Sequence, residues 1–223
     1  MVSDSHAFCP FLKPSRRFQG LKICYAHSQG DVQKNDVAIV QKVLGGDKRA
    51  YAELVDRNKE KAMTLAIRML RNREDAEEAI QDAFVRAFNA LPRFEWKSSF
   101  STWLYRIVYN VCATKLARKG TETLVSIESD NDRESDLPSQ IPAPDAQYES
   151  SEFEEIVLSE IEKLPLPYSP ICTLFFVHDM SYDQIVEVTG MPLGTVKVRL
   201  FRGRIMLRDA VTKRLGVERV DTA

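Results

Sequence analysis

Long apolar runs, closely spaced cysteines and glycine-rich loops are all lacking in this sequence of 223 residues. No stretch approaches the roughly 18 apolar residues that a membrane-spanning helix needs, so direct membrane insertion is not expected. Lys13, Arg16, Arg17 and Lys22 interrupt the N-terminal region, where a secretory signal would need a continuous apolar segment. These absences predict a cytoplasmic protein.

The cysteines stand far apart and show no Cys-x-x-Cys spacing, which is typical of reduced thiols rather than a disulfide framework. They are Cys9, Cys24, Cys112 and Cys172. A metal site built from His6, Cys9, Cys24 and His27 is not expected, because their long central gap lies in an unpatterned stretch. We expect neither a metal nor a cofactor. The lack of a phosphate-binding loop and of a catalytic triad makes an enzyme the least expected class.

A strong surplus of one charge is also missing from the whole chain, whose formal net charge is -1. The average hides a pattern along the sequence. Residues 121–160 contain one basic and 12 acidic side chains, whereas residues 36–120 contain 16 basic and 11 acidic ones. Because electrostatic attraction to a partner is local, the basic blocks on either side of this acidic segment remain compatible with nucleic-acid binding.

The apolar periodicity predicts an all-α protein with two small helical domains. The first covers residues 36–120, with a short helix from Asp36 to Leu44 and longer ones after it. The third is expected to start near Arg73 and to end before Pro92, and the fourth to run from about Thr102 to Arg118.

The second predicted domain covers residues 153–215, and the rest of the chain lacks an apolar period. Residues 1–35 are expected to form a flexible extension and residues 216–223 a tail. Residues 121–152 are rich in Ser, Asp and Pro, a composition that does not offset its own ordering entropy. We therefore expect a flexible acidic linker between the two domains.

The second domain contains a predicted helix-turn-helix at residues 181–204. Ser181 is suited to cap the first helix, and Gly190 permits the tight turn before a second helix that starts near Thr195. Val196 and Leu200 are expected to pack against the first helix. Basic and aromatic side chains are left to project outward, as a helix in the DNA major groove requires. They are Lys197, Arg199, Phe201, Arg202 and Arg204. A helical hairpin with a solvated basic face is the plainer alternative.

The first domain has an aromatic cluster interleaved with cations. Phe94, Trp96, Phe100 and Trp103 lie close to Arg93, Lys97 and Arg106 in the sequence. Unpaired bases stack on such rings while cations follow the backbone of a single strand. Phe100 and Trp103 are expected to serve packing at least in part. A polar stripe on the following helix offers groups for an extruded base; it consists of Arg106, Asn110 and Thr114.

With these stretches in view, the chain resembles an extracytoplasmic-function sigma factor of the sigma-70 family. The likeness rests on DAEEAIQDAF at residues 75–84, FSTWLYRI at residues 100–107 with Asn110, and GTVK at residues 194–197 with RGR at residues 202–204. It implies a sigma-two domain, a linker and a sigma-four domain that together direct RNA polymerase to the promoters of a stress or envelope regulon.

The resemblance also implies partners and contact residues. The helix that includes Glu78, Gln81, Asp82, Val85 and Asn89 would dock on the clamp of the polymerase's largest subunit. The sigma-four domain would sit on the polymerase flap, and an anti-sigma factor would hold the protein inactive.

Promoter contacts follow from the same resemblance. For the minus-ten element the implied residues are Trp96, Lys97, Trp103, Arg106 and Asn110. For the minus-thirty-five element they are Lys197, Val198, Arg199, Phe201 and Arg202. The sequence departs from the family pattern at Thr114, where an acidic residue is usual, and at Val198, where serine is frequent. The N-terminal extension is also longer than typical.

Two other functions remain open at this point. A stand-alone helix-turn-helix regulator would bind duplex DNA tightly without polymerase. An adaptor that binds only proteins would not need Lys197 or Arg202.

Overall fold

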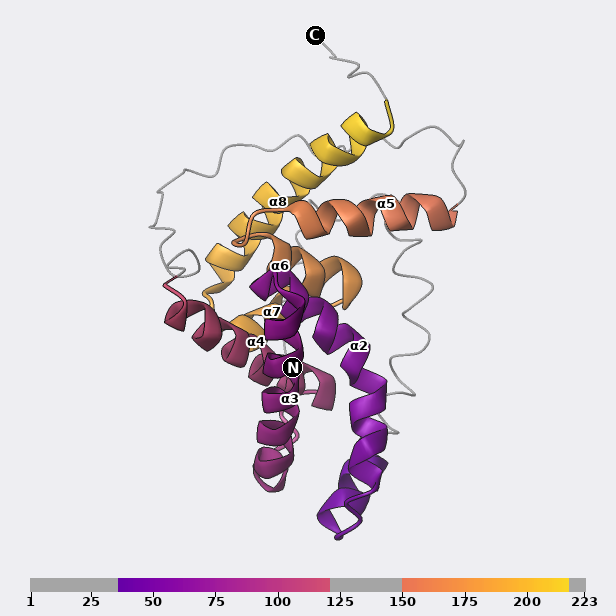
Figure 1. Cartoon of the computed structure of the whole chain (residues 1–223), viewed down its shortest axis with the longest axis vertical. Helices are drawn as coiled ribbons and strands as arrows, with labels where there is room; N and C mark the ends of the chain where they lie inside the picture. The colour runs from indigo at the N-terminus through magenta and orange to yellow at the C-terminus, as the bar shows by residue number, and fades with distance from the viewer. Residues whose placement is uncertain (1–35, 121–149, 217–223) are drawn as a thin grey trace, which may run out of the picture.

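The computed structural model describes residues 36–120 and 150–216, in which helices joined by short turns and loops are the regular structure and no strand occurs (Figure 1). This confirms the predicted all-α class. The predicted extension, the tail from residue 217 and most of the predicted linker lie outside the described residues. No described helix combines the length and the apolar character needed to cross a bilayer.

The first module, residues 36–120, opens with a helix at residues 36–44. It continues with α2 (Ala50–Leu70), α3 (Arg73–Ala90), the 3-10 helix η2 (Leu91–Arg93) and α4 (Phe100–Arg118). In the turn before α2, Asp47 accepts from the N–H groups of Arg49 at 3.0 Å and Ala50 at 3.3 Å. Asn72 caps α3 by accepting from the N–H of Asp75 at 2.9 Å, which satisfies a donor that the first turn of a helix leaves free.

Ser99 caps α4 by accepting from the N–H of Thr102 at 3.1 Å, so the helix starts at Phe100, two residues before the predicted start. The core of the module lies where α2, α3 and α4 pack on one another. Leu54, Leu65 and Met69 lie on the core side of α2 and are fully buried.

The second module, residues 150–216, contains five helical segments. They are α5 (Ser150–Lys163), α6 (Ser169–Cys172), the π-helix η4 (Thr173–Val177), α7 (Tyr182–Thr189) and α8 (Leu193–Arg214). α5 lies across α8 at the end of the molecule away from α3 (Figure 1). The two helices are joined by Glu160, whose carboxylate accepts from Arg214 at 2.9 Å and from Lys163 at 2.7 Å.

The two modules are packed against each other rather than held apart. α4 lies against α7, and α2 lies against α6 (Figure 1). Across this boundary Arg68 of α2 donates to the hydroxyl of Thr173 at 2.9 Å. We call the boundary the seam. The sequence predicted both modules but held no signal for their contact, because the seam joins residues about 100 positions apart.

Candidate nucleic-acid and polymerase-binding surfaces

The helix-turn-helix forms as predicted, and its turn is defined by local hydrogen bonds. Ser181 and Gln184 make a capping box: the Gln184 N–H donates to the Ser181 hydroxyl at 3.2 Å, and the Ser181 N–H donates to the Gln184 side chain at 2.8 Å. Gly190 ends α7 with φ 70°, a left-handed conformation that glycine adopts without steric cost. α7 is thereby held at a definite angle to α8.

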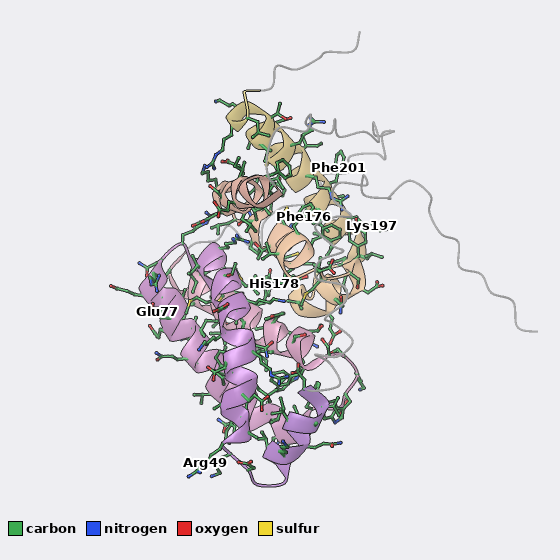
Figure 2. All side chains as sticks on the ribbon, turned by 90° about the vertical axis from the view of Figure 1, so that its right-hand side faces the viewer. Arg49, Glu77, Phe176, His178, Lys197 and Phe201 are labelled. Carbon is green, nitrogen blue, oxygen red and sulfur yellow. The ribbon has the colours of Figure 1, made fainter. Side chains whose placement is uncertain are left out.

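α8 begins at Leu193, two residues before the predicted start. Its buried stripe recurs at i, i+3, i+4, i+7 and i+11, as expected for one face of an α-helix. Val196 and Leu200 are buried as predicted, with 0% and 1% of their surface exposed. Lys197 and Val198 are exposed, while Phe201 and Arg202 are half-buried. Figure 2 labels Lys197 and Phe201 on this helix. The exposed side of α8 therefore offers a cation beside apolar surface.

The expectation that Arg199 projects outward is wrong for this conformation, because only 7% of its surface is exposed. Position 199 is three residues after Val196, so it falls on the buried stripe. Its guanidinium donates to the sulfur of Met191 at 3.2 Å. Its contact with DNA stays a prediction.

Arg204 also turns inward. Its guanidinium lies 4.7 Å from the centre of the Phe175 ring and 5.8 Å from that of Phe176, both at the π-helix. Between these arginines, Gly203 faces α6: a Cβ there would lie 2.5 Å from the sulfur of Cys172. The RGR sequence thus joins α8 to the rest of its module, a role that the sequence alone did not indicate.

The aromatic cluster of the first module is partly core and partly surface. Phe94 and Phe100 are buried, Trp103 is half-buried, and Trp96 is 41% exposed. The Phe94 ring centre lies 4.7 Å from that of Trp96 and 5.0 Å from that of Trp103. The prediction that Phe100 and Trp103 serve packing is confirmed. Trp96 has φ 58°, which is rare for a bulky residue and typical of functional positions.

The predicted polar stripe of α4 is exposed at all three positions, Arg106, Asn110 and Thr114. The Thr114 hydroxyl donates to the backbone carbonyl of Asn110 at 2.8 Å, so its donor is used within the helix. The Asn110 side chain projects from the same surface. Lys97, in the preceding loop, forms an exposed ion pair with Glu95. The exposed ring of Trp96 and the exposed polar stripe of α4 thus both reach the surface of the first module.

The predicted polymerase-binding residues lie on the solvent side of α3. Glu78, Gln81, Val85 and Asn89 are exposed, and Asp82 is half-buried. Val85 is 60% exposed, the most of any large apolar side chain in the described ranges. An apolar side chain exposed to this degree among polar ones is the usual composition of a protein-binding surface.

An open groove separates α3 from α4 and mixes both signs of charge. It is lined by Glu78, Asp82, Arg86, Lys115, Arg118 and Lys119. Lys115 bridges Glu78 at 2.7 Å and Asp75 at 3.3 Å. The ammonium groups of Lys119 and Lys115 lower the pKa of Asp75. The basic end of α4 is thereby tied to the acidic start of α3, an arrangement that the two helix dipoles favour.

The N-terminal histidines and cysteines, from which no metal site was expected, lie outside the described residues. Within residues 36–120 and 150–216, no group of three or more His, Cys, Asp or Glu side chains is arranged to hold a metal. Burial raises the pKa of the thiols of both Cys112 and Cys172 to about 12, so each is an unreactive core residue.

The fold and these surfaces define a helical protein with two modules, one with a helix-turn-helix and one with a ring-and-polar surface suited to single strands. Comparison with known protein families shows which family the chain belongs to. Residues 54–122 match the model of sigma-70 region 2, and residues 154–207 match that of sigma-70 region 4.

Curated relatives agree with both matches. The chain is 32% identical to the ECF RNA polymerase sigma-E factor of Haemophilus influenzae, over 80% of this chain and 96% of that one. It is 35% identical to the ECF RNA polymerase sigma factor SigW of Bacillus subtilis, over 76% of this chain and 92% of that one. The chain therefore belongs to the sigma-70 family, in its extracytoplasmic-function group.

Two solved structures share the fold. One is CnrH in complex with the cytosolic domain of CnrY, with a TM-score of 0.52 and 21% identity, over 82% of this chain and 97% of that one. The other is the sigma factor RpoE in complex with the anti-sigma factor NepR from Bartonella quintana, with a TM-score of 0.53 and 21% identity, over 76% and 98%. At this identity the likeness concerns the fold alone.

Proposed function

We propose that this sigma factor binds core RNA polymerase in the cytoplasm and directs it to promoters, with the first module capturing the melted minus-ten strand and the second reading the minus-thirty-five duplex. The observation that carries the proposal is the pairing of two different nucleic-acid surfaces in one chain. α8 exposes Lys197 and Val198 behind a well-formed turn, α4 exposes Arg106 and Asn110, and the loop before α4 exposes the ring of Trp96.

Each surface suits its strand for a physical reason. A rigid helix with outward cations enters the major groove, where it meets phosphates and base edges. An exposed ring offers a stacking surface for an unpaired base, worth about 1–3 kcal/mol per base. Melting would then be driven by capture of the opened strand, so the function needs no catalytic residue of its own.

Polymerase would meet the solvent side of α3, where Val85 stands exposed among Gln81, Asp82 and Asn89. An anti-sigma factor is the proposed regulator, supported by the related fold of RpoE, which was solved with the anti-sigma factor NepR. A stress regulon is proposed on the same likeness to extracytoplasmic-function relatives.

Run-off transcription with core polymerase and a promoter library tests the function. We expect selective initiation that core polymerase alone does not give. Lys197→Ala should lower minus-thirty-five-dependent initiation by roughly tenfold, the effect of one base or phosphate contact. Lys213→Ala is the matched control, because it removes the same exposed charge near the other end of α8. Equal loss in both variants would contradict the assignment of Lys197.

A second pair of variants tests strand capture. Asn110→Ala should slow open-complex formation, which permanganate reactivity of unpaired thymines reports directly. Thr114→Ala is its control, since the Thr114 hydroxyl already donates to the backbone of the same helix. If Asn110→Ala leaves melting unchanged, the first module does not capture a base through this side chain.

A further inference from the structure

The outer side of α8 has a second apolar stripe, in addition to the one that packs on the core of its module. Its members recur at i, i+4, i+7 and i+11, and they are Gly194, Val198, Phe201 and Ile205. We call these four positions the outer stripe. Gly194 and Val198 are exposed, while Phe201 and Ile205 are half-buried. Single apolar side chains on a surface are ordinary, but a continuous apolar strip is typical of a binding surface.

The charges around the outer stripe have one sign, which indicates the kind of partner. No Asp or Glu occurs from residue 190 to residue 208, whereas five Lys and Arg side chains do. With roughly 3.6 residues per turn, Lys197 and Arg202 fall on opposite edges of the stripe. Apolar surface between two cations fits the DNA major groove, where phosphates border the base edges. The same charges would repel a basic partner.

Val198 holds the position in the outer stripe that is best placed to meet a base. It is the sixth residue of α8, and the first turns of a recognition helix are the part that contacts base edges. It is 49% exposed, and one turn before it a Cβ at Gly194 would meet nothing within 4 Å. Because a valine in a helix has one strongly preferred rotamer, its methyl groups are held in a fixed direction. A base edge can therefore approach this side chain closely.

The chemistry of the Val198 side chain restricts what it can recognise. It has no hydrogen-bond donor or acceptor, so it makes no hydrogen bond to a phosphate or to the polar atoms of a base. The apolar group that the major groove presents is the methyl group at C5 of thymine, whereas cytosine has hydrogen at C5 and an amino donor beside it. 5-Methylcytosine carries the same methyl group at the same place. Serine, which is frequent at this position in the family, can hydrogen-bond to more than one base and would discriminate less.

We infer that Val198 is a specificity-determining residue that recognises the C5 methyl group of one pyrimidine in the minus-thirty-five duplex. Thymine and 5-methylcytosine are the two sources of that group. Burying the methyl group against Val198 should raise the affinity for the duplex by about fourfold, the value of one methyl group removed from water. The inference rests on the proposed function, because it requires the second module to read this duplex.

Replacement of single thymines by deoxyuridine tests the inference, because the two bases differ only in the C5 methyl group. The full-length chain, bound to core polymerase, first selects its preferred minus-thirty-five duplex from a randomised library. Each thymine of that duplex is then replaced in turn, and the affinity of the holoenzyme is measured by competition. At least one replacement should lower the affinity by about fourfold. A holoenzyme that loses nothing at any thymine would overturn the inference.

Val198→Ala shows whether this side chain is responsible. Because Val198 is exposed, the substitution leaves the core packing intact, and thymine and deoxyuridine should then bind equally at the pyrimidine concerned. Val198→Ser should lose the preference for the methyl group in the same way. Met206→Ala is the matched control, because Met206 is 38% exposed on the same helix but lies off the outer stripe. It should keep the fourfold difference. A thymine preference that survives in Val198→Ala, or that is lost equally in Met206→Ala, would contradict the assignment.

The methylation of cytosine separates the two sources of the methyl group. A promoter variant with cytosine at the pyrimidine concerned should bind the wild-type holoenzyme about fourfold more tightly once that cytosine is methylated at C5. In Val198→Ala, methylation should have no effect. If methylation gives no gain in the wild-type holoenzyme while thymine is still preferred, the methyl group is not what Val198 recognises, and the inference is wrong.

Failure of this inference and failure of the proposed function give different results. A chain that directs selective initiation but does not distinguish thymine from deoxyuridine keeps the proposed function and loses the role of Val198. A chain that gives no selective initiation on any promoter loses both.

Discussion

The cores of the two modules and the seam between them differ in how completely their buried polar groups are hydrogen-bonded. Inside the modules such groups find partners: Asn58 donates to the Leu54 carbonyl at 2.8 Å, and Ser169 donates to the Ile161 carbonyl at 3.0 Å. At the seam, the Nε of Arg199 is buried without an acceptor. Satisfied cores suit modules that stay folded, whereas an unsatisfied boundary suits surfaces that separate.

The largest expected effect is the loss of folding stability when a buried side chain in a module core is shortened. Leu104 is fully buried in α4, and Leu104→Ala should lower the free energy of unfolding by about 2–5 kcal/mol through lost burial and a residual cavity. Urea denaturation followed by circular dichroism measures this loss. A loss below about 1 kcal/mol would mean that this core is no better packed than the seam.

A second test concerns the close approach of α6 and α8. Gly203→Ala should destabilise by about 1–3 kcal/mol, because the added Cβ would lie 2.5 Å from the Cys172 sulfur. Cys172→Ala in the same chain should recover part of this loss, which a double-mutant cycle quantifies. Gly194→Ala is the control, since a Cβ there meets nothing within 4 Å. Equal losses in both glycine variants would rule out the steric explanation.

Lowering the pH should weaken the contact between the modules at the seam without destabilising the core of either module. Burial, with the positive charges of Lys61 and Arg68, lowers the pKa of His178 from 6.5 to about 3 when the modules are packed together, and Tyr105 faces it from α4. An imidazole exposed by loss of this packing takes up a proton below pH 6.5, whereas the enclosed imidazole does not until about pH 3. The seam is therefore fully stable above pH 6.5 and weakens as the pH falls, by up to about tenfold per pH unit.

Energy transfer between fluorophores placed at the exposed Lys59 and Lys213, one in each module, checks this direction when it is followed from pH 7.5 to pH 5.5. In His178→Phe the profile should become flat, because the titrating group has been removed. A wild-type profile that is already flat would show that His178 does not control the seam.

The smallest effect is expected at a local cap. Ser181→Ala removes one half of the capping box of α7 and should cost about 1 kcal/mol. Thermal unfolding should show the loss, and energy transfer across the seam should not change. A large change in transfer would mean that the angle of the helix-turn-helix, rather than contacts such as that of Arg68 with Thr173, controls the seam.

The sequence was a good guide wherever a short pattern has one physical solution. The cap at Ser181, the turn at Gly190 and the burial of Val196 and Leu200 all formed as predicted. It was a poorer guide to α8, where counting cations led us to expect Arg199 on the outside. Its position three residues after Val196 already favoured the buried stripe, and that signal was available.

What the amino-acid order alone determined is the helical class, the two modules and the motifs that identify the family, because these depend on contacts within one helix or between neighbours in sequence. The tertiary structure decided how the modules meet: which carbonyls receive Arg68 and Arg71, where His178 is enclosed, and that Arg199 is withdrawn from the surface. Those contacts join residues that are far apart along the chain. Their geometry is set by packing, which no local pattern encodes.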